Sequence, residues 1–279
     1  MIEIWTEELS GDWKWTPNKF CGGTIEFAVE TARVLSKFEE VVVYYDGEPI
    51  EHNGVYYLPR SNFKGNDIVL SCNSHAPNKG KYNIYWTSWA NQTQDKCLDY
   101  DERIVLSPYH QSIFGENSRI VPLGCWKDNF KDGKKARGFC LYSSSPDRGG
   151  FYLKSIWEEV FDKTGAVLIS TYRSDISEEE MQDIYKKSQF WLHPGQGIEL
   201  FCLSGLKAQV AGCIPIVVPN MALETTIKIG VKTTADKYKS DLIEAIKNPP
   251  EVEEFDCLSW VDVTKDLFKK TNIFSEVIA

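Results

Sequence analysis

Two short segments of the chain combine glycine with other residues that suit an anionic ligand. Gly22-Gly23 stands directly before an expected helix, and residues 143–150 contain three serines, Arg148 and two glycines. Paired glycines let a backbone approach a ligand closely, and the N-terminus of a helix attracts anions. An arginine offers charge-assisted hydrogen bonds to phosphate oxygens. Both segments therefore predict contacts with phosphate, with a tight turn and a solvated loop as the respective alternatives.

A third segment, residues 191–215, is the densest in such residues. An expected buried strand leads to His193, a glycine-rich loop with Gly197 follows, and Glu199 stands at the start of an expected apolar helix. A carboxylate in that position either pairs with the helix dipole or accepts hydrogen bonds from hydroxyl groups of a ligand. A lone histidine at the end of a strand is more often a hydrogen-bonded core residue.

The elements that must position these segments alternate between strands and helices along the chain. Strands are expected at residues 2–6, 41–45, 54–58, 67–72, 83–87, 103–107, 119–122, 139–142, 167–171, 189–193 and 214–218. Helices are expected at residues 24–38, 151–164, 177–187, 199–211, 242–247 and 263–268. Ser177 and Glu180 are spaced as a capping box at the start of one helix. Such alternation favours parallel sheets covered by helices.

The strand–helix units fall into two groups on either side of a polar stretch near residues 126–137. We therefore expect an α/β fold of two Rossmann-like domains that face each other across a cleft. The N-terminal domain is expected to span residues 1–126 and the C-terminal domain residues 127–262, followed by a helical segment at 263–279. Ligands of such folds bind at the carboxyl ends of the strands.

Composition excludes several classes of function. The 279 residues are 42% hydrophobic and 25% charged, which is ordinary for a globular protein and suits about two domains. The net charge of −9 argues against a dedicated nucleic-acid binder, because an acidic surface repels phosphates. The apolar runs are too short to span a bilayer, and no signal-peptide pattern is present. We expect a cytoplasmic protein without a membrane span.

The eight cysteines give no sign of a metal or redox centre. The nearest two, Cys202 and Cys213, are eleven residues apart, so the chain has no Cys-x-x-Cys pair. Most of them lie in or beside apolar segments. They are expected to be reduced thiols in the core.

The third segment resembles the donor-site signature of the retaining GT-B glycosyltransferases of glycosyltransferase family 4. In that family a loop after a strand leads to a glutamate, an apolar stretch and the block Glu-Ala-x-Ala-x-Gly-x-Pro. Glu199 matches the first glutamate, and the residues in register with the block are Ala208, Ala211, Gly212 and Pro215. Weaker likenesses to one branch of the family occur at residues 144–149 and 222–225, at Gly22-Gly23 with Glu26, and at residues 107–110. The chain is similar to a short, divergent member of this family.

The resemblance implies a glycosyltransferase that moves a sugar from a UDP- or GDP-linked donor to a glycan, lipid or protein acceptor. It also implies retention of configuration by front-face attack, and it implies neither a metal nor a cofactor. Glu199 would hold hydroxyls of the donor sugar, and Arg148 would neutralise the leaving diphosphate. Further donor-binding residues implied by the resemblance are Gly22, Gly23, Ser144, His193, Gly197, Leu200, Phe201, Lys207, Glu224 and Thr225.

The resemblance also implies where the acceptor binds and where the chain ends. The acceptor would lie in the N-terminal domain, and the C-terminal helix would return to that domain. Tryptophan rings stack on sugars, so the tryptophans expected in its loops are candidates for acceptor contacts, with core filling as the alternative for each. These tryptophans are Trp13, Trp15, Trp86 and Trp89.

Three positions differ from the family pattern. Lys207 replaces the second glutamate, which grips the ribose hydroxyls, and a lysine cannot accept those hydrogen bonds. Gln209 or another group would then have to compensate. Ser143 replaces an arginine of the phosphate loop, and Thr87-Ser88 replaces the usual His-Asp pair.

Two other functions are compatible with parts of the sequence. A degenerate GT-B protein could bind a sugar or nucleotide without catalysis, and the three differences favour that alternative. A dehydrogenase is disfavoured, because Gly195-Gln196-Gly197 lacks the third glycine and the downstream acid of a dinucleotide fingerprint. A glycosyltransferase that acts on DNA bases is disfavoured by the negative charge.

Overall fold

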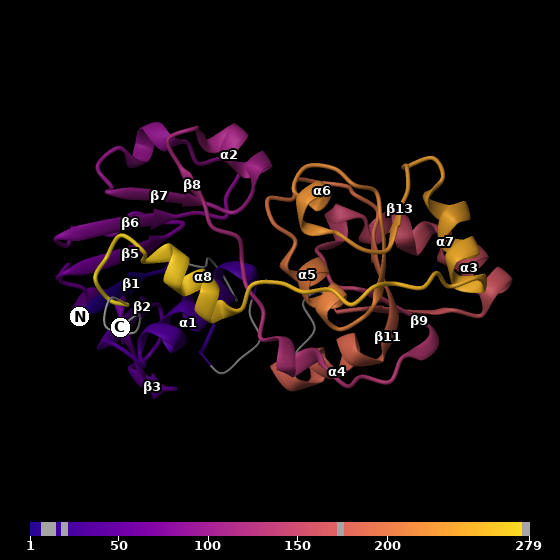
Figure 1. Ribbon diagram of the computed structural model, residues 1–279, viewed down its shortest axis with the longest axis horizontal. Coiled ribbons are helices and arrows are strands. Elements are labelled where there is room, and N and C mark those ends of the chain that lie inside the picture. The colour runs from indigo at the N-terminus through magenta and orange to yellow at the C-terminus, as the bar shows by residue number, and fades with distance from the viewer. Residues whose placement is uncertain (7–14, 18–21, 172–175, 275–279) are drawn as a thin grey trace. The chain divides into compact units, whose positions relative to one another are not determined.

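The computed structural model describes residues 1–6, 15–17, 22–171 and 176–274, and the chain forms two compact units (Figure 1). Unit 1 contains Met1–Gly124 and Leu258–Ala279, and unit 2 contains Cys125–Cys257. Trp13 and Cys21 lie outside the described residues.

Unit 1 contains an eight-stranded sheet with the order β3-β4-β2-β1-β5-β6-β7-β8. Its strands are β1 (Ile2–Trp5), β2 (Val41–Tyr45), β3 (Ile50–His52), β4 (Val55–Pro59), β5 (Ile68–Cys72), β6 (Tyr82–Trp86), β7 (Glu102–Val105) and β8 (Arg119–Ile120). All neighbours are parallel except β3 and β4, which form a hairpin that we did not predict. Its turn, Asn53-Gly54, has positive φ at both residues. β1 and β2 are buried along their whole length. β2 is accordingly apolar or aromatic throughout, and the one charged residue of β1, Glu3, accepts a hydrogen bond from the hydroxyl of Tyr44 at 2.9 Å.

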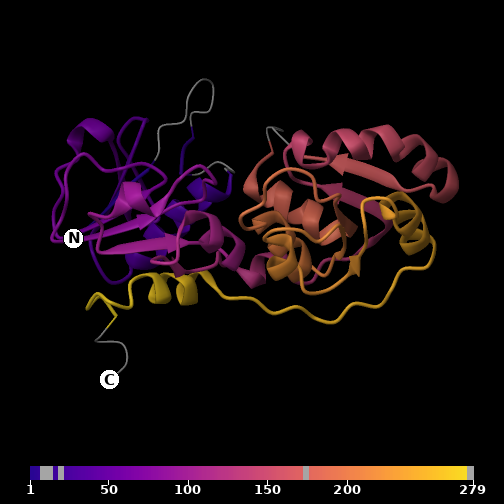
Figure 2. The same cartoon turned by 90° about the horizontal axis from the view of Figure 1, so that it is seen from above.

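The helices of unit 1 are α1 (Gly23–Leu35), α2 (Pro108–Phe114) and α8 (Trp260–Leu267). The segment after residue 257 belongs to unit 1, and α8 packs against α1 there (Figures 1 and 2). Arg119 fixes the end of α8, because its guanidinium donates to the carbonyl oxygens of Asp266 and Leu267 at 3.1 and 3.0 Å. The same guanidinium pairs with the buried Glu102 at 2.8 Å.

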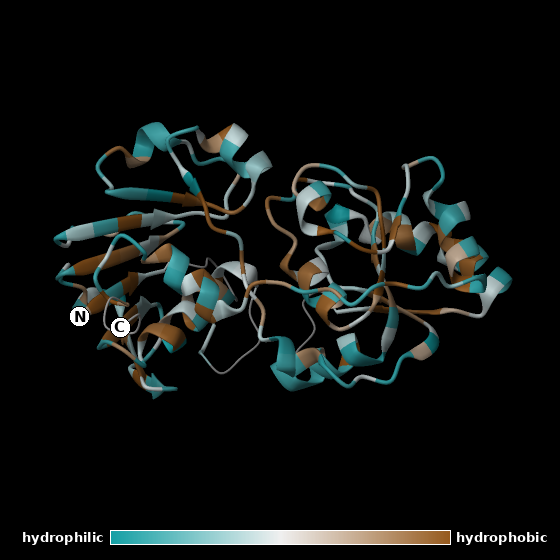
Figure 3. Ribbon diagram, viewed as in Figure 1, coloured by the Kyte–Doolittle hydropathy of each residue, from teal (hydrophilic) through white to brown (hydrophobic). Residues whose placement is uncertain are grey.

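Unit 2 contains a five-stranded, fully parallel sheet with the order β10-β9-β11-β12-β13. Its strands are β9 (Ala136–Tyr142), β10 (Val167–Ser170), β11 (Ser188–His193), β12 (Ile214–Val217) and β13 (Val231–Lys232). Its helices are α3 (Gly150–Thr164), α4 (Glu178–Lys187), α5 (Leu203–Val210), α6 (Leu223–Thr226) and α7 (Tyr238–Lys247). Apolar side chains on the central strands form its core, and the helices carry hydrophilic residues as well (Figure 3).

The helix expected at residues 199–211 begins later than predicted. Glu199 lies in a loop, and α5 starts at Leu203. The reason is a long-range contact, because the carbonyl of Glu199 accepts a hydrogen bond from the backbone of Ala222 at 3.2 Å. By contrast, the capping box of Ser177 and Glu180 is present as predicted.

Each unit is built on parallel strands with connecting helices, apart from the β3–β4 hairpin of unit 1, so the expected α/β fold with two Rossmann-like domains is confirmed. Six of the cysteines that the structure describes are buried, as expected, and Cys257 is half-buried. Within the described residues, no helix has the length and apolar character needed to cross a bilayer.

His110 is a fully buried histidine on α2. Its Nδ1 accepts a hydrogen bond from the backbone N–H of Leu106 at 3.3 Å. Burial lowers the pKa of His110 from 6.5 to about 4. Its neutral form is therefore favoured in the folded protein, whereas the unfolded chain takes up a proton near pH 6.5.

The first prediction concerns this histidine. Its folded-state pKa is depressed, so its contribution to stability is complete above pH 6.5 and is lost as the pH falls toward 4. We expect it to lower the free energy of unfolding by about 2 kcal/mol between pH 7 and pH 5. Urea titrations at both pH values should show that His110→Gln loses this part of the pH dependence. The partly buried His52 provides the control, and an equal effect of His52→Gln would refute the assignment.

The loop after β11 generates a second prediction. Gly195 has φ of +71°, and a Cβ there would lie 2.5 Å from the carbonyl oxygen of Val218. Gly165 has nearly the same φ, +70°, but an added Cβ would meet nothing within 4 Å. Gly195→Ala should therefore destabilise the protein by roughly 1–3 kcal/mol more than Gly165→Ala, as measured by urea unfolding. Equal costs would show that the close approach is not limiting.

Candidate functional site

The candidate site of unit 2 is built on the carboxyl ends of three adjacent strands. β11 lies between β9 and β12, and each of the three ends in a loop, at residues 143–149, 194–202 and 218–222. Trp191 of β11 pairs with Leu141 of β9, so the two strands end at the same level. The two glycine-containing segments that the sequence analysis singled out in this half of the chain are therefore neighbours at one edge of the sheet.

Arg148 and Glu199 meet between these two loops. Nη1 of Arg148 lies 2.8 Å from Oε2 of Glu199, in a hydrogen-bonded ion pair. The Glu199 side chain is 5% exposed and that of Arg148 39%. Burial opposes the charge of Arg148, but the negative groups around it, chiefly Glu199, together outweigh burial and raise the pKa of Arg148. Gly197 makes room for this contact, because a Cβ there would lie 3.2 Å from Cγ of Arg148.

His193 is the second basic group beside Glu199. It is fully buried at the end of β11, with Nε2 3.8 Å from Oε2 of Glu199. Nδ1 accepts a hydrogen bond from the backbone N–H of Gly195 at 3.1 Å. A neutral ring with its lone pair on Nδ1 carries its proton on Nε2. The Nε2–H of His193 can therefore donate a hydrogen bond, and it has no hydrogen-bond partner among the described residues.

Three side chains of this site form the cluster whose spacing could hold a metal ion. The ligand atoms of His193, Glu199 and Cys202 lie within 4.8 Å of one another, and all three residues are buried. These three side chains do not suit a cation. Nε2 of His193 bears a proton, and the Glu199 carboxylate is already paired with Arg148. Burial also raises the pKa of the Cys202 thiol, which keeps it protonated.

The remaining residues of the first two loops have different surroundings. Ser144 and Leu200 are buried, and Phe201 is partly exposed just before α5. Ser143, which stands where the family has an arginine, has a structural role. Its hydroxyl accepts a hydrogen bond from Nε1 of Trp191 at 3.0 Å and lies 3.1 Å from the hydroxyl of Tyr185.

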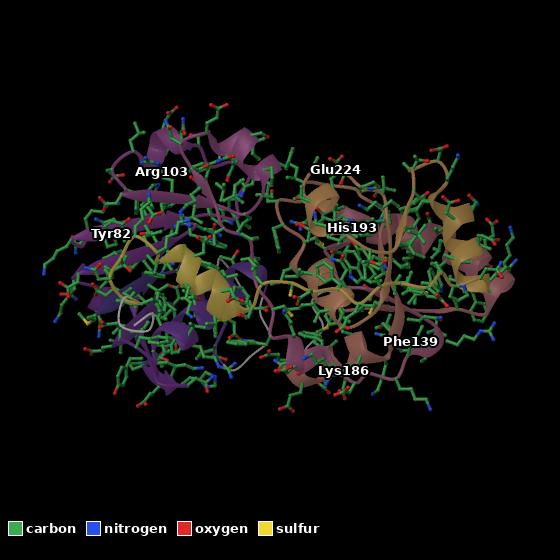
Figure 4. The ribbon with its side chains drawn as sticks, in the orientation of Figure 1. Tyr82, Arg103, Phe139, Lys186, His193 and Glu224 are labelled. Atoms are coloured by element: carbon green, nitrogen blue, oxygen red, sulfur yellow. The ribbon has the colours of Figure 1, made fainter. Side chains whose placement is uncertain are left out.

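The third loop is joined to Glu199 by its backbone. Ala222, which donates to the Glu199 carbonyl, immediately precedes the short helix α6 with Glu224 and Thr225. Both of these side chains are exposed, whereas His193 is buried; Figure 4 labels Glu224 and His193. The structure thus ties α6 to the loop of Glu199 through the backbone.

Two polar residues of α5, Lys207 and Gln209, are buried. Lys207 is buried, with 7% of its surface exposed. Gln209 does not offer a free acceptor for ribose: its amide nitrogen donates to the carbonyl groups of Gly205 and Thr226, and its oxygen accepts from the backbone of Lys228. The suggestion that Gln209 replaces the missing glutamate is therefore wrong, because these backbone contacts already use both ends of its amide.

Gly22 and Gly23 belong to unit 1, at the start of α1. Gly22 has φ of −65°, and an added Cβ would meet nothing within 4 Å, so the described surroundings do not require glycine there. A polar cluster that we did not predict lies beside this helix start. Thr24 Oγ1 is 2.8 Å from Ser88 Oγ, and Nδ2 of Asn73 donates to Ser88 Oγ at 3.0 Å. The position of Asn73, directly after a strand, was the available signal.

The tryptophans of unit 1 are mostly core residues. Trp86, named among the loop tryptophans although it falls within the strand expected at residues 83–87, ends β6, is fully buried and stacks on Phe27 with 3.9 Å between ring centroids. Trp15 is also buried and packs against Tyr45. Trp89 is 39% exposed, so of the tryptophans named above that the structure describes, it alone presents a large part of its surface.

Comparison with solved structures identifies the fold. The chain is similar to sucrose-phosphate synthase from Thermosynechococcus elongatus, with a TM-score of 0.62 and 12% identity over 96% of this chain and 93% of that one. It is similar to HepE from Anabaena in complex with UDP and glucose, with a TM-score of 0.61 and 10% identity over 100% and 98%. It is also similar to the catalytic domain of starch synthase IV from Arabidopsis thaliana, bound to ADP and acarbose. That comparison has a TM-score of 0.62 and 10% identity over 99% of this chain and 96% of that one.

The sequence matches no protein-family model and no curated protein. At these identities the likeness defines the architecture, and the three solved structures named above are glycosyltransferases of the GT-B fold. The two Rossmann-like units of this chain thus have the GT-B fold.

Proposed function

We propose that this protein is a glycosyltransferase that takes its sugar from a nucleotide-sugar donor bound in unit 2. The observation that carries the proposal is the Arg148–Glu199 pair at the carboxyl ends of β9 and β11. A cation for a diphosphate and a carboxylate for sugar hydroxyls stand side by side where Rossmann-like folds bind ligands. The solved structures with UDP and glucose, and with ADP and acarbose, support a donor of this class.

The chemistry follows from the charges of these residues. When the bond between sugar and phosphate breaks, negative charge grows on the diphosphate, and Arg148 would stabilise it. The dipole of α5, which begins four residues after Glu199, favours the same charge. Glu199 would orient the sugar through its hydroxyls, with Leu200 and Phe201 beside it. The charge compensation needs no metal in this proposal.

The finer features of the proposal follow the family resemblance. They are retention of configuration, an acceptor glycan, lipid or protein at unit 1, and roles for Gly22, Gly23, Ser144, Lys207, Glu224 and Thr225 around the donor. Gln209 serves the backbone, so the proposal includes no ribose contact by that residue. The exposed Trp89 is our candidate for an acceptor contact.

Nucleotide binding provides the test. We expect UDP, GDP or ADP, but not CMP or NAD, to raise the melting temperature. At 100 times the dissociation constant the rise should be on the order of 5 °C. Arg148→Ala should abolish it through the loss of a charge-assisted hydrogen bond. Arg137→Ala, which removes an exposed arginine of β9, is the matched control. A rise with NAD alone, or one that survives Arg148→Ala, would contradict the proposal.

A non-catalytic module is the second candidate, favoured by Ser143 and Lys207 at positions where the family has an arginine and a glutamate. The two candidates differ in turnover. Release of nucleoside diphosphate from a bound nucleotide sugar, lost in Arg148→Ala, supports the transferase. Binding without release supports the module.

A further inference from the structure

The ion pair raises a question about the order of events in donor binding, and the answer rests on the proposed function. Glu199 holds Nη1 of Arg148 at 2.8 Å, so a diphosphate that takes this guanidinium as its full counter-ion competes with the carboxylate. The two ends of the pair differ in freedom. Glu199 is 5% exposed and its backbone is tied to Ala222, whereas Arg148 is 39% exposed. Arg148 is thus the end that can turn toward a ligand.

The departure of Arg148 would leave a buried carboxylate without its counter-ion. Removal of one partner from a buried pair is strongly unfavourable for this reason. Within the described residues, the basic side chains within 4.0 Å of the Glu199 carboxylate are Arg148 and His193. The Nε2–H of His193 has no partner there, and a movement of roughly 1 Å would bring it to hydrogen-bond distance.

An intact donor and the product left after transfer differ in what they offer Glu199. A nucleotide sugar brings hydroxyl groups that can donate to the carboxylate while its diphosphate takes Arg148. A nucleoside diphosphate takes Arg148 and brings no sugar hydroxyls, so the carboxylate is left with His193 alone. The intact donor therefore gives Glu199 sugar hydroxyls in place of Arg148, whereas the nucleoside diphosphate removes Arg148 and gives Glu199 nothing in its place.

We propose that Glu199 competes with the diphosphate for Arg148, so that the site favours an intact nucleotide sugar over the nucleoside diphosphate that remains after transfer. His193 acts as a positioning residue that holds the Glu199 carboxylate when Arg148 turns to the ligand. The return of Arg148 to Glu199 then promotes product release.

The test compares the affinities of UDP and UDP-glucose by calorimetry, with ADP and ADP-glucose and with GDP and GDP-mannose as the other pairs. Glu199→Gln keeps the shape of the side chain but no longer holds Arg148 by charge. We expect this variant to bind the nucleoside diphosphate about tenfold more tightly than the wild type, and the nucleotide sugar no more tightly. Asp147→Asn removes an exposed carboxylate from the same loop and should change neither affinity by more than about threefold.

The outcomes separate this inference from the proposed function. If the wild type binds a nucleoside diphosphate through Arg148 but Glu199→Gln weakens or does not alter that binding, the proposed function stands and the inference is wrong. If neither the wild type nor Glu199→Gln binds any of the six nucleotides, both are wrong. If Asp147→Asn tightens binding as much as Glu199→Gln, general electrostatics explains the effect and the inference is also wrong.

A second pair of variants tests His193 without a change of charge at Glu199. His193→Phe removes the Nε2–H, and we expect it to lower the affinity for the nucleoside diphosphate severalfold and that for the nucleotide sugar less, because the sugar hydroxyls still donate to Glu199. His193→Gln keeps a donor and should restore most of the affinity for the nucleoside diphosphate. The measured quantity is the ratio of the affinities for the nucleoside diphosphate and the nucleotide sugar. A loss of packing alone would not change this ratio in His193→Phe and restore it in His193→Gln. An unchanged ratio in His193→Phe would overturn the role of His193.

Discussion

The contact between Arg148 and Glu199 is the interaction on which the site of unit 2 depends. It joins the loops that follow two adjacent strands, β9 and β11, and it compensates a carboxylate that is almost completely buried. A buried charge has to be paired, so the pair constrains both loops. The glycine at position 197 and the backbone bond from Ala222 to Glu199 maintain the geometry in which the pair forms.

Other polar groups in unit 2 support this arrangement without taking part in it. Gln209 joins α5 to the end of α6 and to the segment after it, because its amide nitrogen donates to the carbonyl of Thr226 and its oxygen accepts from the backbone of Lys228 and Ile229. Ser143 joins β9 to Trp191 and Tyr185. These residues stand near or at positions to which the family resemblance gives ligand-binding roles. The structure uses both side chains for hydrogen bonds within unit 2.

Features with local causes were predictable from the sequence. The capping box at Ser177 gives the start of α4, and the unbroken apolar run gives β2. The turn signal Asn53-Gly54 was present but unused, so β3 was missed. The start of α5 and the burial of Trp86 depend on partners distant in sequence, Ala222 and Phe27, which no local pattern reveals. Arg148 and Glu199 were both predicted as site residues. Their contact across 51 residues could not be, because it requires the register of β9 against β11.

The central claim is that Arg148 and Glu199 bind the two halves of one nucleotide sugar. A crystal structure of the protein with a nucleotide sugar, UDP-glucose first, tests it most directly. The account predicts that the guanidinium of Arg148 contacts the diphosphate and that the Glu199 carboxylate accepts hydrogen bonds from sugar hydroxyls. A nucleotide sugar bound elsewhere in the protein, with the Arg148–Glu199 pair intact, would contradict it.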